Sequence, residues 1–200
     1  MAPQLLLTTP AAATPELAPA ALMGVLSAAP VAALLVRRGE RSDADYAALA
    51  KSFINIGQGA GCAVLLEDDW ALAKRLGADG VHITGDEDDV RAALKALKPA
   101  LIVGAGPVST RHDAMVRGEL DVDYLWFGAL DGGPDATGAE LAQWWAETFE
   151  IPAVLHDPAA GDGHADPCGA EFLALGESIW SAPSPAQALA QLAKTLGVTP

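Results

Sequence analysis

Short apolar runs alternate with longer helix-like stretches along all 200 residues, and this alternation limits the possible folds more than any other feature. Each run is four to six residues long and most are apolar throughout, which is typical of parallel strands buried on both faces. The expected strands are 4–8, 31–36, 62–66, 80–83, 100–104, 123–127, 152–155 and 172–175.

Helix-like patterns separate these runs. Several begin with a favourable capping residue: Thr14 before Pro15, Ser42, and Ser184 before Pro185. The expected helices are 15–29, 42–56, 68–76, 87–97, 109–118, 137–149 and 184–196. Strict alternation predicts parallel strands that are joined by helical crossovers.

Eight such units favour a compact (β/α)8 TIM barrel, in the α/β class, over an open doubly wound sheet of the flavodoxin or Rossmann kind. The stretch GAGPVS at 104–109 lacks the third glycine of a dinucleotide-binding fingerprint. After the seventh strand, residues 156–169 are rich in glycine and proline, so helix seven is expected to be reduced or missing. With no linker in view, we expect one domain over 1–200.

The formal net charge of −14 argues against nucleic acid and anionic membranes as partners, because both are bound through basic surfaces. A phosphorylated ligand would need local cations or a metal. No apolar run approaches the length of a membrane span, and no secretory signal pattern is present. Cys62 and Cys168 are too few for a disulfide framework, and Cys62 is expected to be a small buried apolar residue. We therefore expect a cytoplasmic protein.

In a barrel of this kind the active site lies at the carboxyl ends of the strands. Two acidic clusters follow the expected third and fourth strands: Glu67, Asp68 and Asp69, then 86–89. Carboxylates suit Mg²⁺, which usually also binds substrate phosphates. Acids at helix starts are equally explained by the helix dipole, so both interpretations stay open.

Basic residues are scarce near these ends. Arg37 and Arg38 follow the second strand and could bind a phosphate, or form a solvated turn. His82 lies inside the fourth strand, where a packing role and a catalytic role are both open.

The loop 156–169 carries several side chains that could bind a transition metal, but their spacing matches no tight zinc pattern. These side chains are His156, Asp157, Asp162, His164, Asp166 and Cys168.

Four segments carry a family resemblance: LLEDDWALAKRLGADGVHITG, LIVGAG, DVDYLWFGAL and CGAEFLALGESIW. In this order they resemble thiamine phosphate synthases, a family that also includes thiazole tautomerases. The resemblance implies a (β/α)8 fold. It also implies that a hydroxymethylpyrimidine diphosphate is joined to a thiazole phosphate, with Mg²⁺ on the diphosphate, so the expected ligand is small and either phosphorylated or of the pyrimidine type.

The resemblance also assigns roles to particular residues. The first magnesium aspartate of the family falls on Asp68, and the second on Glu87 or Asp88. The family's basic group after strand two falls on Arg37 or Arg38. The remaining positions implied for substrate binding are His82, Gly104, Gly106, Gly176 and Ser178.

The chain departs from the family pattern at several of these places. Glu67 and Asp69 stand where the family has asparagine and arginine, and the loop after strand six has no lysine. A family Gly-Gly pair falls on Asp157 and Pro158, which adds a negative charge and removes a backbone N–H donor. Glu177 adds a further acid after strand eight.

Three interpretations remain open. The chain is a transferase of the thiamine phosphate synthase kind, or a degenerate paralogue that binds a small molecule or a partner without catalysis. The third is an enzyme acting on an unphosphorylated substrate, with His82 or His156 as its base.

Overall fold

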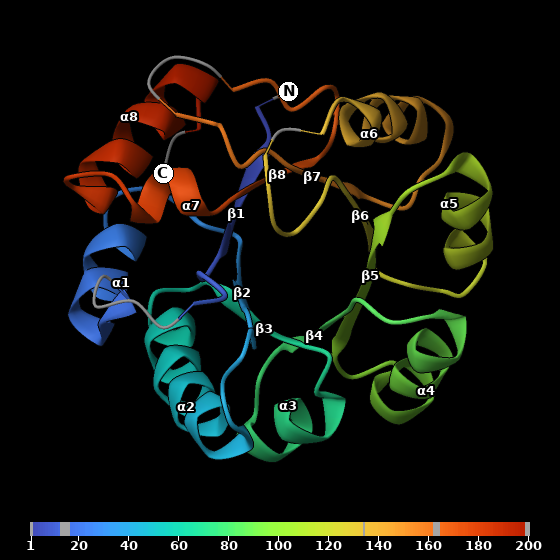
Figure 1. The fold of residues 1–200 in the computed structure, drawn as a ribbon, viewed down its shortest axis with the longest axis horizontal. Helices are drawn as coiled ribbons and strands as arrows, with labels where there is room; N and C mark the ends of the chain where they lie inside the picture. The colour runs from blue at the N-terminus through green and yellow to red at the C-terminus, as the bar shows by residue number, and fades with distance from the viewer. Residues whose placement is uncertain (1, 13–16, 134, 162–164, 199–200) are drawn as a thin grey trace.

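The computed structural model describes residues 2–12, 17–133, 135–161 and 165–198. Its parallel strands close into a barrel in chain order, β1 to β8, with helices around the outside (Figure 1). The strands are β1 Gln4–Thr8, β2 Ala33–Val36, β3 Ala63–Glu67, β4 Gly80–Ile83, β5 Ile102–Val108, β6 Tyr124–Phe127, β7 Ala153–His156 and β8 Phe172–Leu175. This topology confirms the (β/α)8 prediction and excludes an open doubly wound sheet.

The helices lie between the strands and cover the outer face of the barrel. They are α1 Pro19–Leu26, α2 Asp43–Gly59, α3 Trp70–Leu76, α4 Glu87–Leu97, α5 Arg111–Gly118, α6 Ala136–Thr148, α7 Glu177–Trp180 and α8 Pro185–Leu196. No helix is found among the described residues between β7 and β8, as predicted. The short α7 was not expected, and it follows β8 together with α8.

Helix starts agree with the sequence signals only in part. Ser42 caps α2 by accepting a hydrogen bond from the backbone N–H of Asp45 at 3.2 Å. Ser184 precedes α8 as expected, but its side chain accepts no capping hydrogen bond. Helix α1 begins at Pro19 rather than at 15, and the predicted cap at Thr14 and Pro15 lies outside the described residues.

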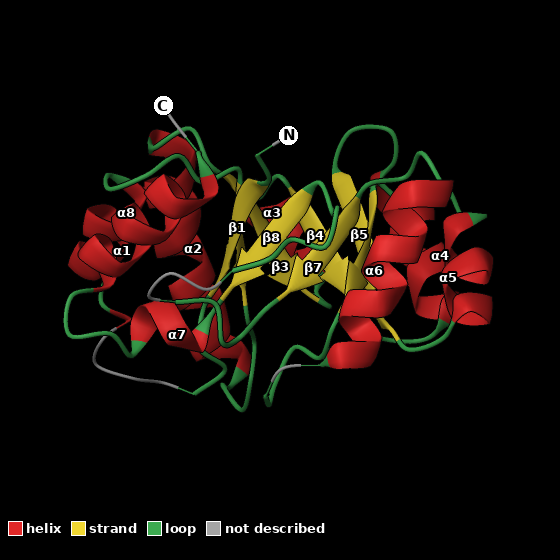
Figure 2. Cartoon of the chain, turned by 90° about the horizontal axis from the view of Figure 1, so that it is seen from above, coloured by secondary structure: helices red, strands yellow, loops and turns green. Residues whose placement is uncertain are grey.

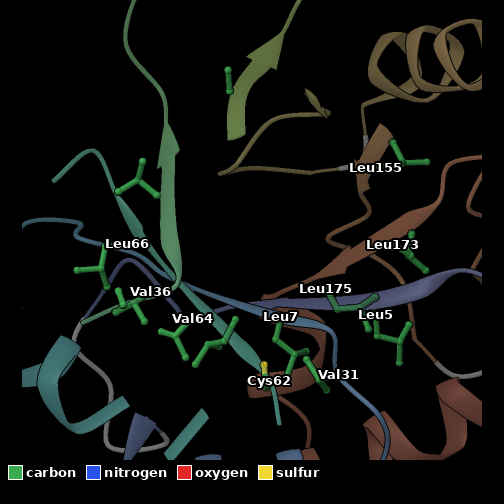
Figure 3. Close-up of a cluster of buried hydrophobic side chains, with 14 of the residues drawn as sticks. Leu5, Leu7, Val31, Val36, Cys62, Val64, Leu66, Leu155, Leu173 and Leu175 are labelled. Atoms are coloured by element: carbon green, nitrogen blue, oxygen red, sulfur yellow. The ribbon is translucent and has the colours of Figure 1, made fainter. Parts of the chain in front are cut away.

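The core has two layers because neighbouring residues of a strand point to opposite faces. Outward-facing residues such as Leu5, Val64 and Leu173 pack toward the helices, and Cys62 is buried in the same cluster (Figure 3). Inward-facing residues fill the barrel itself: Leu6, Ala33, Leu35, Leu65, Tyr124, Trp126, Val154 and Ala174. The interior is therefore a packed core, as small barrels require.

Two glycines of β5 make room for the aromatic part of this inner layer. A Cβ at Gly104 would overlap the Tyr124 ring, and one at Gly106 would lie 2.6 Å from the Trp126 Cβ. Gly106 also has φ of +152°, which disfavours any side chain. The packing of Tyr124 and Trp126 therefore explains why both positions are glycine.

The two ends of the barrel differ. Seen from the side, α7 lies at the end opposite the marked chain termini, which is the end where the strands finish (Figure 2). Among the described helices, none is both long and apolar enough to cross a membrane.

Candidate active site at the barrel mouth

The carboxyl ends of β2 and β3 open into a cavity of about 1130 Å³. Its lining includes three arginines and several carboxylates: Arg37, Arg38, Arg41, Glu40, Asp45, Glu67, Asp68 and Asp131. Parallel strands bring these side chains together because all the strands end on the same face. The predicted positions Arg37, Arg38 and Asp68 therefore lie around one cavity.

Arg37 follows β2 directly, points inward and is only 5 % exposed. Its Nε donates to Glu67 Oε1 at 2.7 Å, Nη1 to the Leu130 carbonyl at 3.0 Å, and Nη2 to Asp131 Oδ2 at 2.9 Å. Burial acts to lower the pKa of Arg37, but the two carboxylates outweigh it and the pKa is raised. Through these hydrogen bonds, Arg37 links the end of β2 to β3 and to the loop after β6.

Glu67, the last residue of β3, binds both Arg37 and the backbone of Arg38. One of its oxygens accepts from Arg37, and the other accepts from the backbone N–H of Arg38 at 2.6 Å. The residue is 7 % exposed, and an unpaired carboxylate at such a position would be costly. Both oxygens of the Glu67 carboxylate are therefore satisfied inside the chain.

Arg38 and Arg41 lie farther out. Arg38 pairs with Asp43, approaches Asp69 at 4.0 Å, and places its guanidinium carbon 5.6 Å from the centre of the Tyr46 ring. Arg41 donates to the carbonyls of Ala11 and Ala12, each at 2.8 Å. Both residues are partly exposed at the mouth, whereas Arg37 is buried.

Asp68 is held where β3 and β4 end. Its φ is +57°, a conformation that aspartate and asparagine adopt more readily than most residues. Its N–H donates to the His82 carbonyl at 3.0 Å, and its carboxylate accepts from both the N–H and the hydroxyl of Thr84. The residue is exposed, so these bonds orient a carboxylate that stays accessible.

Most of the acids after β4 form hydrogen bonds or ion pairs within α4 itself. Asp86 caps α4 by accepting from the N–H groups of Asp88 and Asp89 at 3.0 and 3.1 Å, and Glu87 pairs with Arg91. This supports the helix-dipole interpretation for the run. Asp88 is exposed.

A cavity of about 310 Å³ beside Asp68 is lined by Asp89, not by Glu87 or Asp88. Sequence reasoning did not single out Asp89. The spacing of the capping box, in which Asp89 reaches back to the Asp86 N–H at 3.2 Å, would have marked it. Among the described residues, no three His, Cys, Asp or Glu side chains are gathered to hold a metal ion. The set Asp68, Glu87 and Asp88 stays a prediction.

His82 lies inside the barrel below the mouth and is fully buried. Its Nδ1 is 3.0 Å from the Tyr124 hydroxyl, and its ring stacks on Tyr124 and tilts against Trp126, with centroids 5.7 and 5.0 Å away. Burial, together with Arg37 and Arg117, lowers the pKa of His82 to about 3. The ring is therefore neutral at physiological pH, and these contacts describe a packing histidine.

A second group of predicted residues meets at the ends of β7 and β8. His156 is 5 % exposed, and its Nδ1 is 2.6 Å from the Ala129 carbonyl. Gly176 lies beside it, and the buried Ser178 Oγ has no hydrogen-bond partner among the described residues. His156 thus belongs to the mouth, which the family resemblance alone did not indicate.

The loop after β7 gathers no metal site in its described part. Asp157 accepts from the Ala159 N–H, and Asp166 accepts from the Cys168 N–H, as in ordinary turns. Cys62 and Cys168 are both free thiols. Asp162 and His164 lie outside the described residues.

The chain is similar to known proteins in sequence. A family model described as thiamine monophosphate synthase matches residues 5–156. The thiamine-phosphate synthase of Rhodospirillum centenum is 31 % identical over 205 residues, covering 96 % of this chain and 97 % of that protein. That of Hyphomonas neptunium is 34 % identical, covering 78 % and 76 %. The match to that of Erythrobacter litoralis is 37 % identical but spans only 60 % of either chain.

Solved structures give the same fold. A thiamine phosphate pyrophosphorylase from Pyrococcus furiosus has a TM-score of 0.80 at 20 % identity, covering 97 % of this chain and 95 % of that one. A tryptophan synthase from M. tuberculosis has a TM-score of 0.70 at 14 % identity, covering 98 % and 93 %. At such identities these likenesses concern the fold alone, and the sequence matches confirm the resemblance that the motifs carry.

Proposed function

Because the chain belongs to the thiamine monophosphate synthase family, we propose that its barrel mouth transfers a pyrimidinylmethyl group from hydroxymethylpyrimidine diphosphate to a thiazole. The bond between the methylene carbon and the diphosphate oxygen breaks, and diphosphate leaves with the electron pair. The thiazole nitrogen then bonds to that carbon and becomes the positive centre of a thiazolium. The observation that carries this proposal is Asp68, oriented by Thr84 beside the arginine-lined cavity.

Arg38 and Arg41 are the groups we assign to the diphosphate. Both line the large cavity, and arginine binds phosphate oxygens through paired N–H donors. Arg37 is not assigned to this role, because it is buried and its charge is matched by the buried Glu67 and by Asp131, whereas Arg38 is partly exposed and pairs with the exposed Asp43. Of the two arginines that the sequence offered for binding a phosphate, we therefore propose Arg38.

A magnesium ion fits the donors on the β3–β4 side. Asp68, the Thr84 hydroxyl and the acids of the first turn of α4 are hard oxygen ligands, and Mg²⁺ needs only one or two carboxylates besides phosphate oxygens. We propose Asp68 with one of Glu87, Asp88 or Asp89. When bound, the ion would offset charge on the departing diphosphate.

The proposal is tested by incubating the protein with the pyrimidine diphosphate, Mg²⁺ and either thiazole phosphate or thiazole alcohol, and by following the product chromatographically. Asp68→Asn should lower kcat/KM about 100-fold, because the charge on the leaving group loses its counterpart. Asn tolerates the same backbone conformation.

Asp121→Asn is the matched control. Asp121 is also exposed with positive φ, at +62°, but it precedes β6 at the opposite end of the barrel. Activity should be unchanged. Equal activity of Asp68→Asn and wild type would refute the assignment.

A second function has its own support. By the family resemblance, Asp157 and Pro158 stand where a Gly-Gly pair would favour a phosphate, and Glu177 adds a further acid, which suits a paralogue that binds a ligand without turnover. Thermal shifts with the pyrimidine diphosphate, with and without Mg²⁺, separate the two: stabilisation without product formation supports the binding protein. We propose the cytoplasm as the site of action in either case.

A further inference from the structure

A cavity of about 300 Å³ lies at the end of the barrel opposite the mouth, where the strands begin. This is the end near the marked chain termini in Figure 2. Its walls are mostly apolar and come from inward-facing residues of several strands: Leu6, Leu65, Tyr124, Val154 and Phe172. The cavity is apart from the mouth, and its volume lies at the lower limit of pockets that hold small molecules.

Two alanines leave this space open. Ala33 of β2 and Ala63 of β3 are partners in the sheet register, and both line the cavity. Bulky branched residues usually fill the inward positions of such barrels, so alanine at both positions leaves a hollow. Water in an apolar hollow finds few hydrogen-bond partners, and an apolar ligand that displaces it gains affinity.

The one charged residue of the lining, Asp123, already has its partners. Its carboxylate accepts hydrogen bonds from Lys98 Nζ at 2.6 Å and from the Val103 N–H at 2.7 Å. An anionic ligand would meet this carboxylate without a cation in the lining, and a cationic ligand would have to displace Lys98. The other polar side chains of the lining, Gln4 and Tyr124, are neutral, so the ligand that fits is neutral too.

Tyr124 and Phe172 give the cavity two aromatic walls. The Tyr124 hydroxyl is 3.0 Å from His82 Nδ1, and burial raises the pKa of Tyr124, so this hydroxyl stays neutral and already has a partner. The ring of Tyr124 is therefore the part of the side chain that is left for a ligand. Aromatic side chains favour flat rings, which pack on them in offset or edge-to-face arrangements.

We infer that this cavity is a second binding site, which takes a small, neutral, aromatic molecule. The inference combines three observations: the space that Ala33 and Ala63 leave, the aromatic walls, and the satisfied charge of Asp123. The site is at the opposite end of the barrel from Asp68 and the arginines, so it does not depend on the transfer reaction proposed above.

The first experiment titrates the whole chain with indole, a flat and neutral ring system, and follows the heat of binding. Indole should bind at a single site with a Kd of about 1 mM or tighter, as a ligand of its size can reach in an apolar pocket. Indole-3-carboxylate has the same ring and a negative charge, so it should bind at least ~10-fold more weakly. No saturable binding of indole, or equal binding of the two compounds, overturns the inference.

Variants that fill the cavity locate the bound indole. Ala33→Leu and Ala63→Leu should each weaken its binding at least ~10-fold, because the added side chain occupies the space of the ring. Ala60→Leu is the matched control, since Ala60 is exposed and lines a neighbouring cavity at the same end of the barrel. Undiminished binding to either filled variant, or a comparable loss in Ala60→Leu, overturns the assignment.

If Ala33→Leu does not fold, Ala63→Leu carries the test, because Ala63 is only half-buried and Ala33 is buried. Thermal unfolding then gives a second measurement. Indole should raise the Tm of the wild type and of Ala60→Leu, because it binds the folded state, and should leave the Tm of Ala63→Leu unchanged. An equal rise in all three proteins overturns the assignment.

The histidines report where the ring lies. His82 stacks on Tyr124 with centroids 5.7 Å apart, so its side-chain nitrogen resonances should shift as indole is added and reach a plateau at the calorimetric saturation point. The exposed His112 on α5 should not shift. A shift of His156, which lines a cavity of the mouth, without a shift of His82 would place indole at the mouth and overturn the inference.

Discussion

The two halves of the barrel mouth differ in how the polar groups at the strand ends find hydrogen-bond partners. On the β2–β4 half, Glu67, Asp68 and Asp86 accept hydrogen bonds from Arg37, Thr84 and the first turn of α4. On the β6–β8 half, His156 Nε2 and Ser178 Oγ are buried without partners among the described residues, as His82 Nε2 of β4 is deeper inside the barrel.

This difference shows that a count of charges says little about a ligand. Acids that accept hydrogen bonds or form ion pairs within the chain have a structural role, and they need no ligand to account for them. Acceptors without donors are costly unless a ligand or water satisfies them. The β6–β8 half is therefore the more informative part of the mouth, although the family resemblance is weaker there.

The largest expected effect is on stability, and it tests whether Glu67 has a structural role. Glu67→Ala removes the partner of the buried Arg37 and should lower the free energy of unfolding by about 3–5 kcal/mol. Urea denaturation measures it. Glu40→Ala, at an exposed position of the same cavity, is the control and should change stability by less than ~0.5 kcal/mol.

A loss of less than about 1 kcal/mol for Glu67→Ala would place the pair among weak surface interactions. Glu67 would then be free to serve a ligand, and the comparison between the two halves would fail.

The second prediction concerns His82. Its pKa is about 3 in the folded protein, because of burial and then the nearby Arg37 and Arg117. In the unfolded chain it is about 6.5. Between these values the unfolded state binds one more proton, so stability falls as the pH falls, by up to about 1.4 kcal/mol per pH unit.

The measurement is the free energy of unfolding at pH 7 and pH 5 for wild type and His82→Gln. Wild type should lose about 2 kcal/mol more than the variant over this interval. His112→Gln, an exposed histidine on α5, should behave as wild type. The same slope in wild type and His82→Gln would mean that His82 is not held neutral.

The sequence predicts the strands better than their ends or the site. Apolar runs locate all eight strands. The end of β5 was predicted near 104, because Gly106 and Pro107 suggest a turn, but the strand extends to Val108. The four-residue α7 is too short to show a helical period.

Within the site, the position of Asp68 follows from its place after a strand. The bond between Arg37 and Glu67 does not, because it depends on which residues point into the barrel. The contact of His156 Nδ1 depends in turn on the Ala129 carbonyl, 27 residues away in sequence. Such contacts require the closed register of the strands.

The smallest expected effect concerns Asp131, which touches both halves of the mouth. Its side chain is 72 % exposed although it pairs with Arg37, so Asp131→Ala should lower the free energy of unfolding by less than about 1 kcal/mol. Glu67 continues to hold Arg37. Urea denaturation measures this loss as well. A loss comparable to that of Glu67→Ala would mean that the mouth is one coupled network rather than two halves.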